Sequence, residues 1–385
     1  MNVLFLTHAF PRHSGDAAGS FLLRLARALA GEDIAVSVLA PAAPGLASRD
    51  VIDGIAVRRL RYAPAAWETL AYEGTMVEQV RASWRGRLAL LGLLAAEASA
   101  LRQAVREASA SLVHAHWWFP NGVAAAAAVG RTPLVVTSHG SDVRLARSIK
   151  PARAGLAFVA RRADAYTAVS QWLADEARAL APRLRVSVAP MPVDADRFIP
   201  PDTRPRDTLL FVGRLNAQKG LERLLRALPR LRARVTLDVV GAGDELSRLQ
   251  ALAATLEVAD RVRWHGAQPY ERLAWFYRGA TALVVPSVEE GLGLVAAEAA
   301  LCGAPVVGYD SGGLRDLVLH ERTGRLAREI TPEALAEEID AVLALPDQGA
   351  ALGAAGRAHA LASVSPEAVA RRYAGIYRAA IAARV

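Results

Sequence analysis

Two cations lie in a single glycine-flanked loop in the second half of the chain. Residues 208–212 form an apolar run typical of a buried strand ending at Gly213, and a helical pattern begins near Gly220. Arg214 and Lys219 lie between them, at the strand's carboxyl edge, where ligands bind in parallel sheets. Two fixed cations beside a helix start suit a diphosphate, because they neutralise its charge and the helix adds N–H donors. The alternative interpretation is a pair of solvated surface cations.

A second loop combines two carboxylates with bare backbone. A buried strand ends near Pro286, and Gly291 and Gly293 open the helix that follows, so N–H groups there can approach an anion closely. Glu290 precedes this helix and can accept hydrogen bonds from sugar hydroxyls. Glu298 lies inside it among alanines, where an unpaired carboxylate is costly and a ribose diol would supply hydrogen bonds. The alternatives make Glu290 a helix N-terminal charge and Glu298 half of a salt bridge.

These segments resemble glycosyltransferase family 4, whose donor-site signature is two glutamates separated by seven residues, as Glu290 and Glu298 are. The strings 213–220 and 310–316 match two further signatures, in the same order. The resemblance implies the GT-B fold, in which two Rossmann-like doubly wound α/β domains face a central cleft. It also implies a set of donor-binding residues, namely Gly19, Gly213, Arg214, Lys219, Gly241, His265, Glu290, Gly291, Leu292, Gly293, Leu294 and Glu298.

The resemblance implies catalysis by charge placement, with no metal and no covalent cofactor. Arg214 and Lys219 would stabilise the leaving diphosphate as the glycosidic bond breaks. Glu290 would orient the sugar and Glu298 would hold the ribose. The new bond would keep the anomeric configuration of the donor.

The resemblance extends to a histidine in the first half of the chain. His139 lies in the string 136–142, where the family's histidine faces the donor sugar and its phosphate, so we predict it as a catalytic residue. The alternative is a histidine that caps a strand end. His116, Asn121 and Asp142 are predicted on the acceptor side. His114 and His116 alternate on one strand, but no carboxylate lies nearby in sequence, so we reject a metal site there.

The first loop of the chain departs from the family pattern. Many members carry adjacent glycines there, whereas Gly15 and Gly19 are separated in this chain. Gly19 directly precedes the first helix and fits the phosphate-proximal position best.

The motifs occur in both halves of the chain, so we expect one sheet in each half to position them. Apolar runs alternate with helical patterns in both halves, which is typical of doubly wound α/β domains. Prolines crowd the stretch between the halves. We predict an N-terminal acceptor-binding domain over 1–190, a linker over 191–206, a C-terminal nucleotide-sugar-binding domain over 207–365, and a final helix over 366–385 that crosses back to the first domain. The predicted strands are 3–7, 34–39, 112–115, 134–137, 165–169, 186–188, 208–212, 235–240, 261–265, 283–286 and 305–309.

The amino-acid composition limits which cell compartment and which partners are expected. The 385 residues include one cysteine, Cys302, so no intramolecular disulfide forms and a reducing, cytoplasmic compartment is expected. No secretory signal or membrane-spanning run of about 20 apolar residues is evident. The net charge of +8 comes from the first half, since 1–190 holds 22 Lys and Arg against 14 Asp and Glu, and the rest holds 24 of each. An anionic membrane surface is therefore one partner to consider; compositional drift is the alternative.

The stretch from 67 to 101 mixes aromatic, aliphatic and basic side chains. It could form an interfacial helix on the inner face of a membrane, or an ordinary helix packed on the core. We expect a UDP- or GDP-sugar as donor, a glycan or lipid-linked acceptor, a role in cell-surface polysaccharide or glycolipid synthesis, and no nucleic-acid partner. Two other functions stay open: a nucleotide-sugar epimerase with the same fold, and a sensor that binds the nucleotide sugar without transfer.

Overall fold

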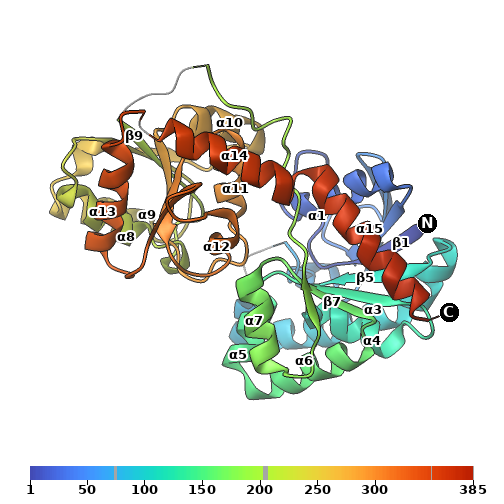
Figure 1. Ribbon diagram of the computed structural model, residues 1–385. Coiled ribbons are helices and arrows are strands. Elements are labelled where there is room, and N and C mark those ends of the chain that lie inside the picture. Colours follow the sequence, from blue (N-terminus) through green and yellow to red (C-terminus); the bar gives the residue numbers. More distant parts are fainter. Residues whose placement is uncertain (73–75, 203–206, 348, 385) are drawn as a thin grey trace. The chain divides into compact units, whose positions relative to one another are not determined.

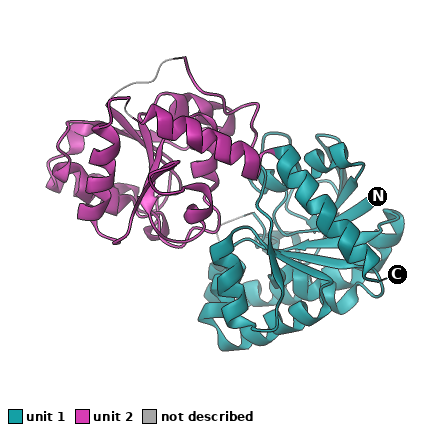
Figure 2. Ribbon diagram, in the orientation of Figure 1, with its two compact units in different colours: residues 1–192, 366–385 teal, residues 193–365 magenta. Residues whose placement is uncertain are grey.

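The chain divides into two compact units. The computed structural model describes residues 1–72, 76–202, 207–347 and 349–384. Unit 1 comprises residues 1–192 and 366–385, and unit 2 comprises residues 193–365 (Figure 2). Figure 1 gives the positions of the helices and strands along the chain.

Unit 1 is built on an eight-stranded sheet in the order β3-β4-β2-β1-β5-β6-β7-β8. Every neighbouring pair is parallel except β3 and β4. Figure 1 shows α1 and α15 on one face of this sheet and α3, α4 and α6 on the other. The strands are β1 (Asn2–Leu6), β2 (Ala35–Pro41), β3 (Arg49–Ile52), β4 (Ile55–Leu60), β5 (Leu112–His116), β6 (Leu134–Ser138), β7 (Ala165–Ala168) and β8 (Val186–Val188).

All six strands predicted for the first half are present, and the hairpin of β3 and β4 was not predicted. Its turn is Asp53-Gly54, with φ of 47° and 85°. An Asp-Gly pair between short apolar runs is the usual signal for a two-residue hairpin. β3 begins with the charged residues Arg49 and Asp50, so it lacks the alternation of apolar and polar residues on which strand prediction depends.

The helices of unit 1 include the last helix of the chain. α15 (Pro366–Ala382) packs against α1 and the short η1 (Leu29–Glu32). The hydroxyl of Tyr373 donates to the carbonyl of Ala189 at 3.0 Å. The remaining helices are α1 (Ser20–Ala28), η2 (Ala65–Trp67), α2 (Met76–Ala82), α3 (Trp84–Glu107), η3 (Trp118–Gly122), α4 (Val123–Ala128), α5 (Ser141–Ser148), α6 (Lys150–Arg162) and α7 (Gln171–Leu180).

Helix α3 corrects one expectation from the sequence. By length and composition alone it could cross a membrane, so the prediction that no such segment exists is wrong on those criteria. Only 28% of its most apolar window is buried. It packs against α2 and α4, burying Leu93 and Leu101. A single helix of this kind is weak evidence for a span, because the core helix of a soluble protein passes the same test.

Glu97 is a buried carboxyl on α3 and gives a pH-dependent prediction. It is 1% exposed, and neither carboxyl oxygen has a hydrogen-bond partner among the described residues. Burial raises the pKa of Glu97 from 4.5 to about 8. Between pH 4.5 and about 8, the carboxyl group of Glu97 therefore stays protonated in the folded state, whereas it releases its proton in the unfolded state. As pH rises from 4.5 to about 8, this group lowers the free energy of unfolding by up to about 1.4 kcal/mol per pH unit.

We expect Glu97→Gln to remove this loss. Its midpoint of thermal unfolding should equal or approach that of the wild type near pH 4.5 and exceed it increasingly up to pH 8, as measured by calorimetry across that range. The control is Glu367→Gln, at an exposed position in the first turn of α15. A difference between Glu97→Gln and wild type that stays constant with pH would contradict the prediction.

Unit 2 contains a six-stranded, wholly parallel sheet in the order β11-β10-β9-β12-β13-β14. In Figure 1, α8, α9 and α13 lie on one face and α10, α11 and α14 on the other. The strands are β9 (Thr208–Val212), β10 (Thr236–Val240), β11 (Val262–Gly266), β12 (Ala282–Val285), β13 (Val306–Tyr309) and β14 (Gly324–Ala327). The helices are η4 (Ala217–Lys219), α8 (Leu221–Ala227), η5 (Leu228–Arg230), α9 (Leu246–Thr255), η6 (Ala259–Arg261), α10 (Tyr270–Arg278), α11 (Leu294–Leu301), α12 (Leu314–Leu317), α13 (Pro332–Leu343) and α14 (Ala350–Val364).

The predicted strands of unit 2 are all present, while β14, α13 and α14 were not predicted. β14 is only four residues long, and it includes Arg325, which pairs with Glu338 at 2.5 Å. α13 carries an N-terminal signal that the prediction did not use. The side chain of Thr331 caps it by accepting from the backbone N–H of Ala334, and Pro332 occupies its first turn.

Two chain connections join the units, at 192–193 and at 365–366. The predicted linker began at residue 191, but residues 193–202 are part of unit 2. Val193 donates to the carbonyl of Val364 at 2.9 Å, and Phe198 is fully buried. Residues 203–206 of that predicted linker lie outside the described residues.

Candidate functional site

The loop after β9 holds Lys219 in a defined position. Asn216 accepts a hydrogen bond from the backbone N–H of Lys219 at 3.1 Å, which closes the single turn of η4. Gly220 then adopts φ 70° at the start of α8. The Lys219 stem crosses Gly213, where an added Cβ would lie 3.6 Å from its Cγ and Cδ. These contacts turn the ammonium group toward the loop after β12.

Lys219 and Glu290 form an ion pair, so the structure brings together two residues predicted from separate motifs. The Nζ of Lys219 lies 2.6 Å from Oε1 of Glu290, and the hydroxyl of Ser287 donates to the same oxygen at 2.7 Å. Glu290 is 7% exposed. Both groups lie at the carboxyl ends of β9 and β12, which are hydrogen-bonded neighbours.

Arg214 is left available on the same loop. Its side chain is exposed and has no hydrogen-bond or ion-pair partner among the described residues. A guanidinium without an internal partner can take an anionic ligand without first breaking a salt bridge. Lys219 differs in this respect, because it is already engaged by Glu290.

The segment 310–316 packs against the Glu290 loop and forms hydrogen bonds with it. Gly313 donates its N–H to the carbonyl of Glu290 at 2.7 Å, and the backbone N–H of Glu289 donates to the hydroxyl of Ser311 at 3.3 Å. An added Cβ at Gly312, whose φ is 64°, would lie 2.6 Å from the nitrogen of Glu290. The third motif therefore positions Glu290, and only glycine fits at this approach.

Glu298 lies on α11 and is 5% exposed. The hydroxyl of Tyr277 donates to its Oε2 at 2.7 Å. Burial, together with the charge of Glu298, raises the pKa of Tyr277 well above its usual range. Sequence reasoning missed Tyr277, because it comes from α10, which matches no motif. Gly291, Leu292, Gly293 and Leu294 form the turn into α11, where Gly293 has φ 83° and precedes the first helical residue.

Gly241 and His265 lie at the ends of β10 and β11. Gly241 has φ 148°, and an added Cβ would lie 1.8 Å from the carbonyl oxygen of Gly213, so two site loops meet there. His265 was predicted to meet the nucleotide base through its backbone. Its ring Nε2 lies 2.7 Å from Oδ1 of Asp238, and its carbonyl accepts from Gln268 at 2.7 Å. Its ring is therefore held against β10 by Asp238, with 28% of the side chain exposed.

The close packing of Gly220 gives a second prediction. An added Cβ there would lie 2.4 Å from the carbonyl oxygen of Pro286, whereas one at Gly266, with similar φ of 66°, would meet nothing within 4 Å. We expect Gly266→Ala to cost about 1 kcal/mol in unfolding free energy from φ alone, and Gly220→Ala about 2–4 kcal/mol. Urea unfolding followed by circular dichroism measures both. Equal losses would show that the Pro286 contact relaxes freely.

His139 and His116 lie together at the carboxyl ends of β6 and β5 in unit 1. Nδ1 of His116 lies 3.2 Å from Nε2 of His139, and the ring of Trp117 is tilted by 35° against the ring of His139, with the two ring centroids 4.2 Å apart. Burial, followed by neighbouring histidine charges, lowers the pKa of both rings well below the usual range. Both imidazoles are therefore neutral near pH 7, and His139 can donate or accept but carries no charge.

His114 shares the face of His116, with ring centroids 3.9 Å apart, as alternation on the strand predicted. It has structural partners: Thr137 at 2.6 Å and the hydroxyl of Tyr377 in α15 at 2.7 Å. No group of three or more His, Cys, Asp or Glu suited to a metal ion occurs in the described parts of the chain.

Asn121 is fully buried beside His116. Its Nδ2 lies 2.9 Å from Nδ1 of His8 and also donates to the carbonyl of His116. Burial lowers the pKa of His8 to about 4, against the opposing effect of the Asn121 hydrogen bond. Oδ1 of Asn121 and Nε2 of His116 are buried with no hydrogen-bond partner among the described residues. Such atoms are costly in a protein interior unless a ligand or water pairs with them.

Asp142, predicted on the acceptor side, has a different role. Its carboxylate is 3% exposed and accepts from the backbone N–H groups of Trp118, His139, Gly140 and Val143 at 3.1–3.2 Å. Burial raises its pKa, although these hydrogen bonds oppose the change. This geometry argues against direct contact with an acceptor. Asp142 instead positions the loops that hold Trp118 and His139.

The loop before α1 is ordered by Asp16 rather than by adjacent glycines. Asp16 pairs with Arg12 at 2.6 Å and accepts from the backbone N–H of Ala18 at 3.2 Å. Burial alone would raise its pKa, but hydrogen bonds, first from Arg12, lower it to about 2. Gly19 has φ 69° and no room for a Cβ, which would lie 2.3 Å from the carbonyl of Ala9. Gly15 has open space and is not constrained in this way.

Family models match nearly the whole chain. The model Glycosyltransferase Family 4 matches residues 18–197, and the model Glycosyl transferases group 1 matches residues 193–359. The D-inositol 3-phosphate glycosyltransferase of Streptomyces scabiei is 33% identical over 92% of this chain and 85% of its own. A GDP-mannose-dependent alpha-(1-6)-phosphatidylinositol monomannoside mannosyltransferase of Mycolicibacterium smegmatis is 35% identical over 60% of this chain and 66% of its own.

Solved structures share the fold. Sucrose-phosphate synthase from Thermosynechococcus elongatus superposes with a TM-score of 0.82 at 24% identity and covers 100% of both chains. HepE of Anabaena, in complex with UDP and glucose, superposes with a TM-score of 0.69 at 20% identity, and the match covers 98% of this chain and 99% of the HepE chain. WaaG, a glycosyltransferase involved in lipopolysaccharide biosynthesis, superposes with a TM-score of 0.65 at 18% identity, and the match covers 97% of this chain and 99% of the WaaG chain. The predicted GT-B fold is confirmed.

Proposed function

The chain belongs to glycosyltransferase family 4, and from this premise we propose that it transfers a sugar from a nucleotide-diphosphate donor with retention of anomeric configuration. It is a glycosyltransferase that uses a nucleotide sugar. The observation that carries the mechanistic proposal is the Lys219–Glu290 pair at 2.6 Å, with Arg214 exposed on the same loop.

The proposed mechanism works by placement of charge. Arg214 and Lys219 stabilise the diphosphate as the glycosidic bond breaks, and backbone N–H groups at the start of α11 add donors. Glu290 fixes the ammonium group of Lys219 and orients the sugar. Glu298 accepts hydrogen bonds from the ribose. No metal is required by this proposal, because the two cations supply the positive charge. His139 contributes a neutral imidazole to the sugar and its phosphate.

A UDP- or GDP-sugar is the proposed donor. The Mycolicibacterium relative depends on GDP-mannose, and the HepE structure holds UDP and glucose. For the acceptor we propose a glycan or a lipid-linked molecule in cell-surface polysaccharide or glycolipid synthesis. The Streptomyces relative acts on D-inositol 3-phosphate and the Mycolicibacterium relative on a phosphatidylinositol monomannoside. His116 and Asn121, with buried unpaired atoms, are the proposed acceptor-side residues.

The proposed location is the cytoplasm, at the inner face of a membrane. The excess of basic residues in 1–190 supports attraction to anionic lipids. Liposome flotation at low salt measures this association. Absence of binding to anionic vesicles would remove the membrane from the proposal without affecting the transfer reaction.

A panel of nucleotide sugars tests the central proposal. Calorimetry should detect binding of a UDP- or GDP-sugar, and nucleotide release should depend on an added acceptor. The anomeric coupling constant of the product, measured by NMR, should match that of the donor. Failure of every UDP-, GDP- and ADP-sugar to bind would contradict the proposal, and an inverted product would contradict the retaining mechanism. An epimerase would instead convert the donor sugar with no acceptor, and a sensor would bind it unchanged.

A further inference from the structure

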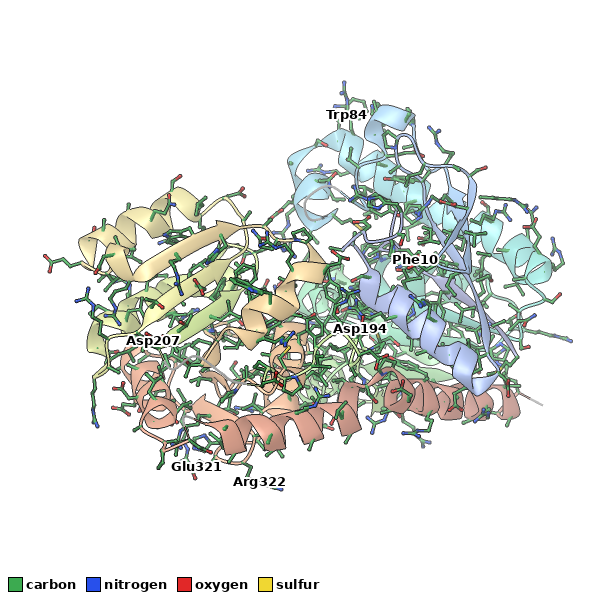
Figure 3. The ribbon with its side chains drawn as sticks, turned by 90° about the horizontal axis from the view of Figure 1, so that it is seen from above. Phe10, Trp84, Asp194, Asp207, Glu321 and Arg322 are labelled. Carbon is green, nitrogen blue, oxygen red and sulfur yellow. The ribbon has the colours of Figure 1, made fainter. Side chains whose placement is uncertain are left out.

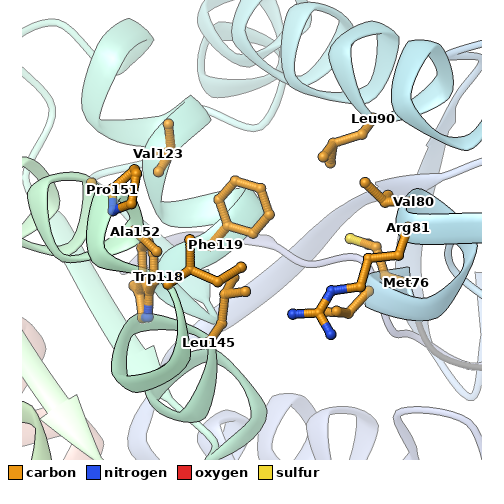
Figure 4. A pocket seen from close by; sticks show the side chains of 13 residues that line it. Met76, Val80, Arg81, Leu90, Trp118, Phe119, Val123, Leu145, Pro151 and Ala152 are labelled. Atoms are coloured by element: carbon orange, nitrogen blue, oxygen red, sulfur yellow. The ribbon is translucent and has the colours of Figure 1, made fainter. Parts of the chain in front are cut away.

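Unit 1 contains an apolar pocket of about 370 Å³ that has no role in the proposed donor chemistry. Its walls are α2, the second turn of α3, the start of η3 and α4, and the turn from α5 to α6. Figure 4 shows Val80, Arg81 and Leu90 on one side of the space and Phe119, Val123 and Ala152 on the other. The volume lies in the range of about 300–1,000 Å³ that small-molecule sites occupy.

The chemistry of the lining selects an apolar ligand. Arg81 is the one charged side chain among the lining residues, and the others are aliphatic, aromatic, proline or glycine. A polar ligand would lose its hydration there without gaining hydrogen bonds. A hydrocarbon chain would gain the transfer free energy of every methylene that it buries. The Arg81 guanidinium, which is exposed, lies where a charged head group could remain in water.

The exposed face of α3, outside the pocket lining, is apolar and basic. Trp84, Leu88 and Leu91 share one face of α3 by helical spacing and are 60%, 49% and 61% exposed. Trp84 projects outward in Figure 3. Arg85 lies 5.7 Å from the ring of Trp84, and Arg87 is exposed one residue before Leu88. Exposed apolar side chains bordered by arginines favour attraction of an anionic amphiphile to this helix, and Arg81 is the arginine at the pocket itself.

The pocket shares a wall with the acceptor-side loop. Trp118 and Phe119 line it, and they lie between His116 and Asn121 in the chain. Trp118 is fixed there, because its backbone N–H and its ring N–H both donate to Asp142, at 3.1 Å and 2.8 Å. A chain held against Phe119 is therefore held by the same loop that carries the unpaired atoms of His116 and Asn121.

We propose that this pocket binds one hydrocarbon chain of an anionic amphiphilic acceptor, with Arg81 beside its head group. This inference rests on the proposed function, since it names the chemical class of the acceptor. The occupant is a single lipid molecule taken up by the pocket, as distinct from the surface of a bilayer.

Calorimetry of the full chain with dodecyl phosphate, below its micelle concentration, tests the proposal. We expect saturable binding, and decyl phosphate should bind about 15-fold more weakly, since each buried methylene contributes about 0.8 kcal/mol. Inorganic phosphate should not bind at this site. Dodecyltrimethylammonium, which has the same chain and the opposite charge, should bind more weakly than dodecyl phosphate.

Two variants with matched controls locate the site. Ala152→Trp fills the pocket and should weaken dodecyl phosphate binding at least tenfold, whereas Ala154→Trp, at an exposed position of the same helix, should not change it. Arg81→Gln should weaken binding of dodecyl phosphate about two- to fivefold, as expected for an exposed charge pair. Arg106→Gln, at an exposed arginine of α3 outside the lining, is its control.

Three outcomes would overturn the inference: unchanged binding in Ala152→Trp, no dependence on chain length, or association with anionic phosphatidylglycerol vesicles without binding of monomeric dodecyl phosphate. The test is independent of sugar transfer. A nucleotide-sugar panel with no binding would remove the proposed function and leave the dodecyl phosphate result standing. Loss of amphiphile binding with intact donor binding would remove only this inference.

Discussion

Lys219→Ala is expected to lower kcat by about 10²- to 10³-fold, the effect of removing one charged group that stabilises a developing anion. The ammonium group is held 2.6 Å from Glu290 and one quarter of the side chain is exposed, so it is already oriented before the donor arrives. The change should appear in kcat more than in KM, because the diphosphate gains charge only as the glycosidic bond breaks. Steady-state nucleotide release with the donor from the panel measures it.

A loss of fold must be separated from a loss of chemistry. Lys219→Ala removes the counter-charge of Glu290, which keeps the hydrogen bond from the hydroxyl of Ser287, and loss of the ion pair around a carboxylate that is 7% exposed is destabilising. The double variant Lys219→Met with Glu290→Gln removes both charges, so its midpoint of thermal unfolding should recover while kcat stays low. The control is Lys150→Ala, an exposed lysine at the start of α6. Recovery of kcat in the double variant would contradict a role for Lys219 in leaving-group departure.

Much of the donor half could be predicted because it depends on strand ends. Arg214, Lys219 and Glu290 follow β9 and β12, and ends of parallel strands meet at one edge of a sheet. Glycine positions were predictable for a similar reason, since Gly220 and Gly293 adopt positive φ where helices begin. What the motifs did not predict is the direct pairing of Lys219 with Glu290, which depends on side-chain reach.

The residues that were missed or given another role act through tertiary contacts. Tyr277 reaches Glu298 from α10, and no spacing in the sequence relates two helices that meet only after folding. Asp142 stands in a motif beside His139, yet its carboxylate turns inward to backbone N–H groups. A motif gives the position of a residue in the chain, whereas burial decides whether its side chain faces a ligand or the protein.

Glu298→Ala is expected to weaken binding of the donor nucleotide about 100-fold. A carboxylate that accepts hydrogen bonds from both ribose hydroxyls contributes about 1.5 kcal/mol or more for each, and 1.4 kcal/mol is a factor of ten. Calorimetry with UDP or GDP, whichever the panel identifies, and with its 2′,3′-dideoxy form gives the contribution directly. The wild type should prefer the ribose form about 100-fold, and Glu298→Ala should bind both forms with similar affinity.

The dideoxy comparison separates ribose recognition from packing. Glu298 also accepts the hydroxyl of Tyr277 at 2.7 Å, so its removal could disturb α11 without any direct contact to the nucleotide. Such a disturbance would weaken both nucleotide forms equally and preserve the preference for ribose, which would contradict the assigned role. Tyr277→Phe should lower the unfolding free energy yet keep most of that preference, because the carboxylate remains. Glu271→Ala, at an exposed position of α10, should change neither quantity and serves as the matched control.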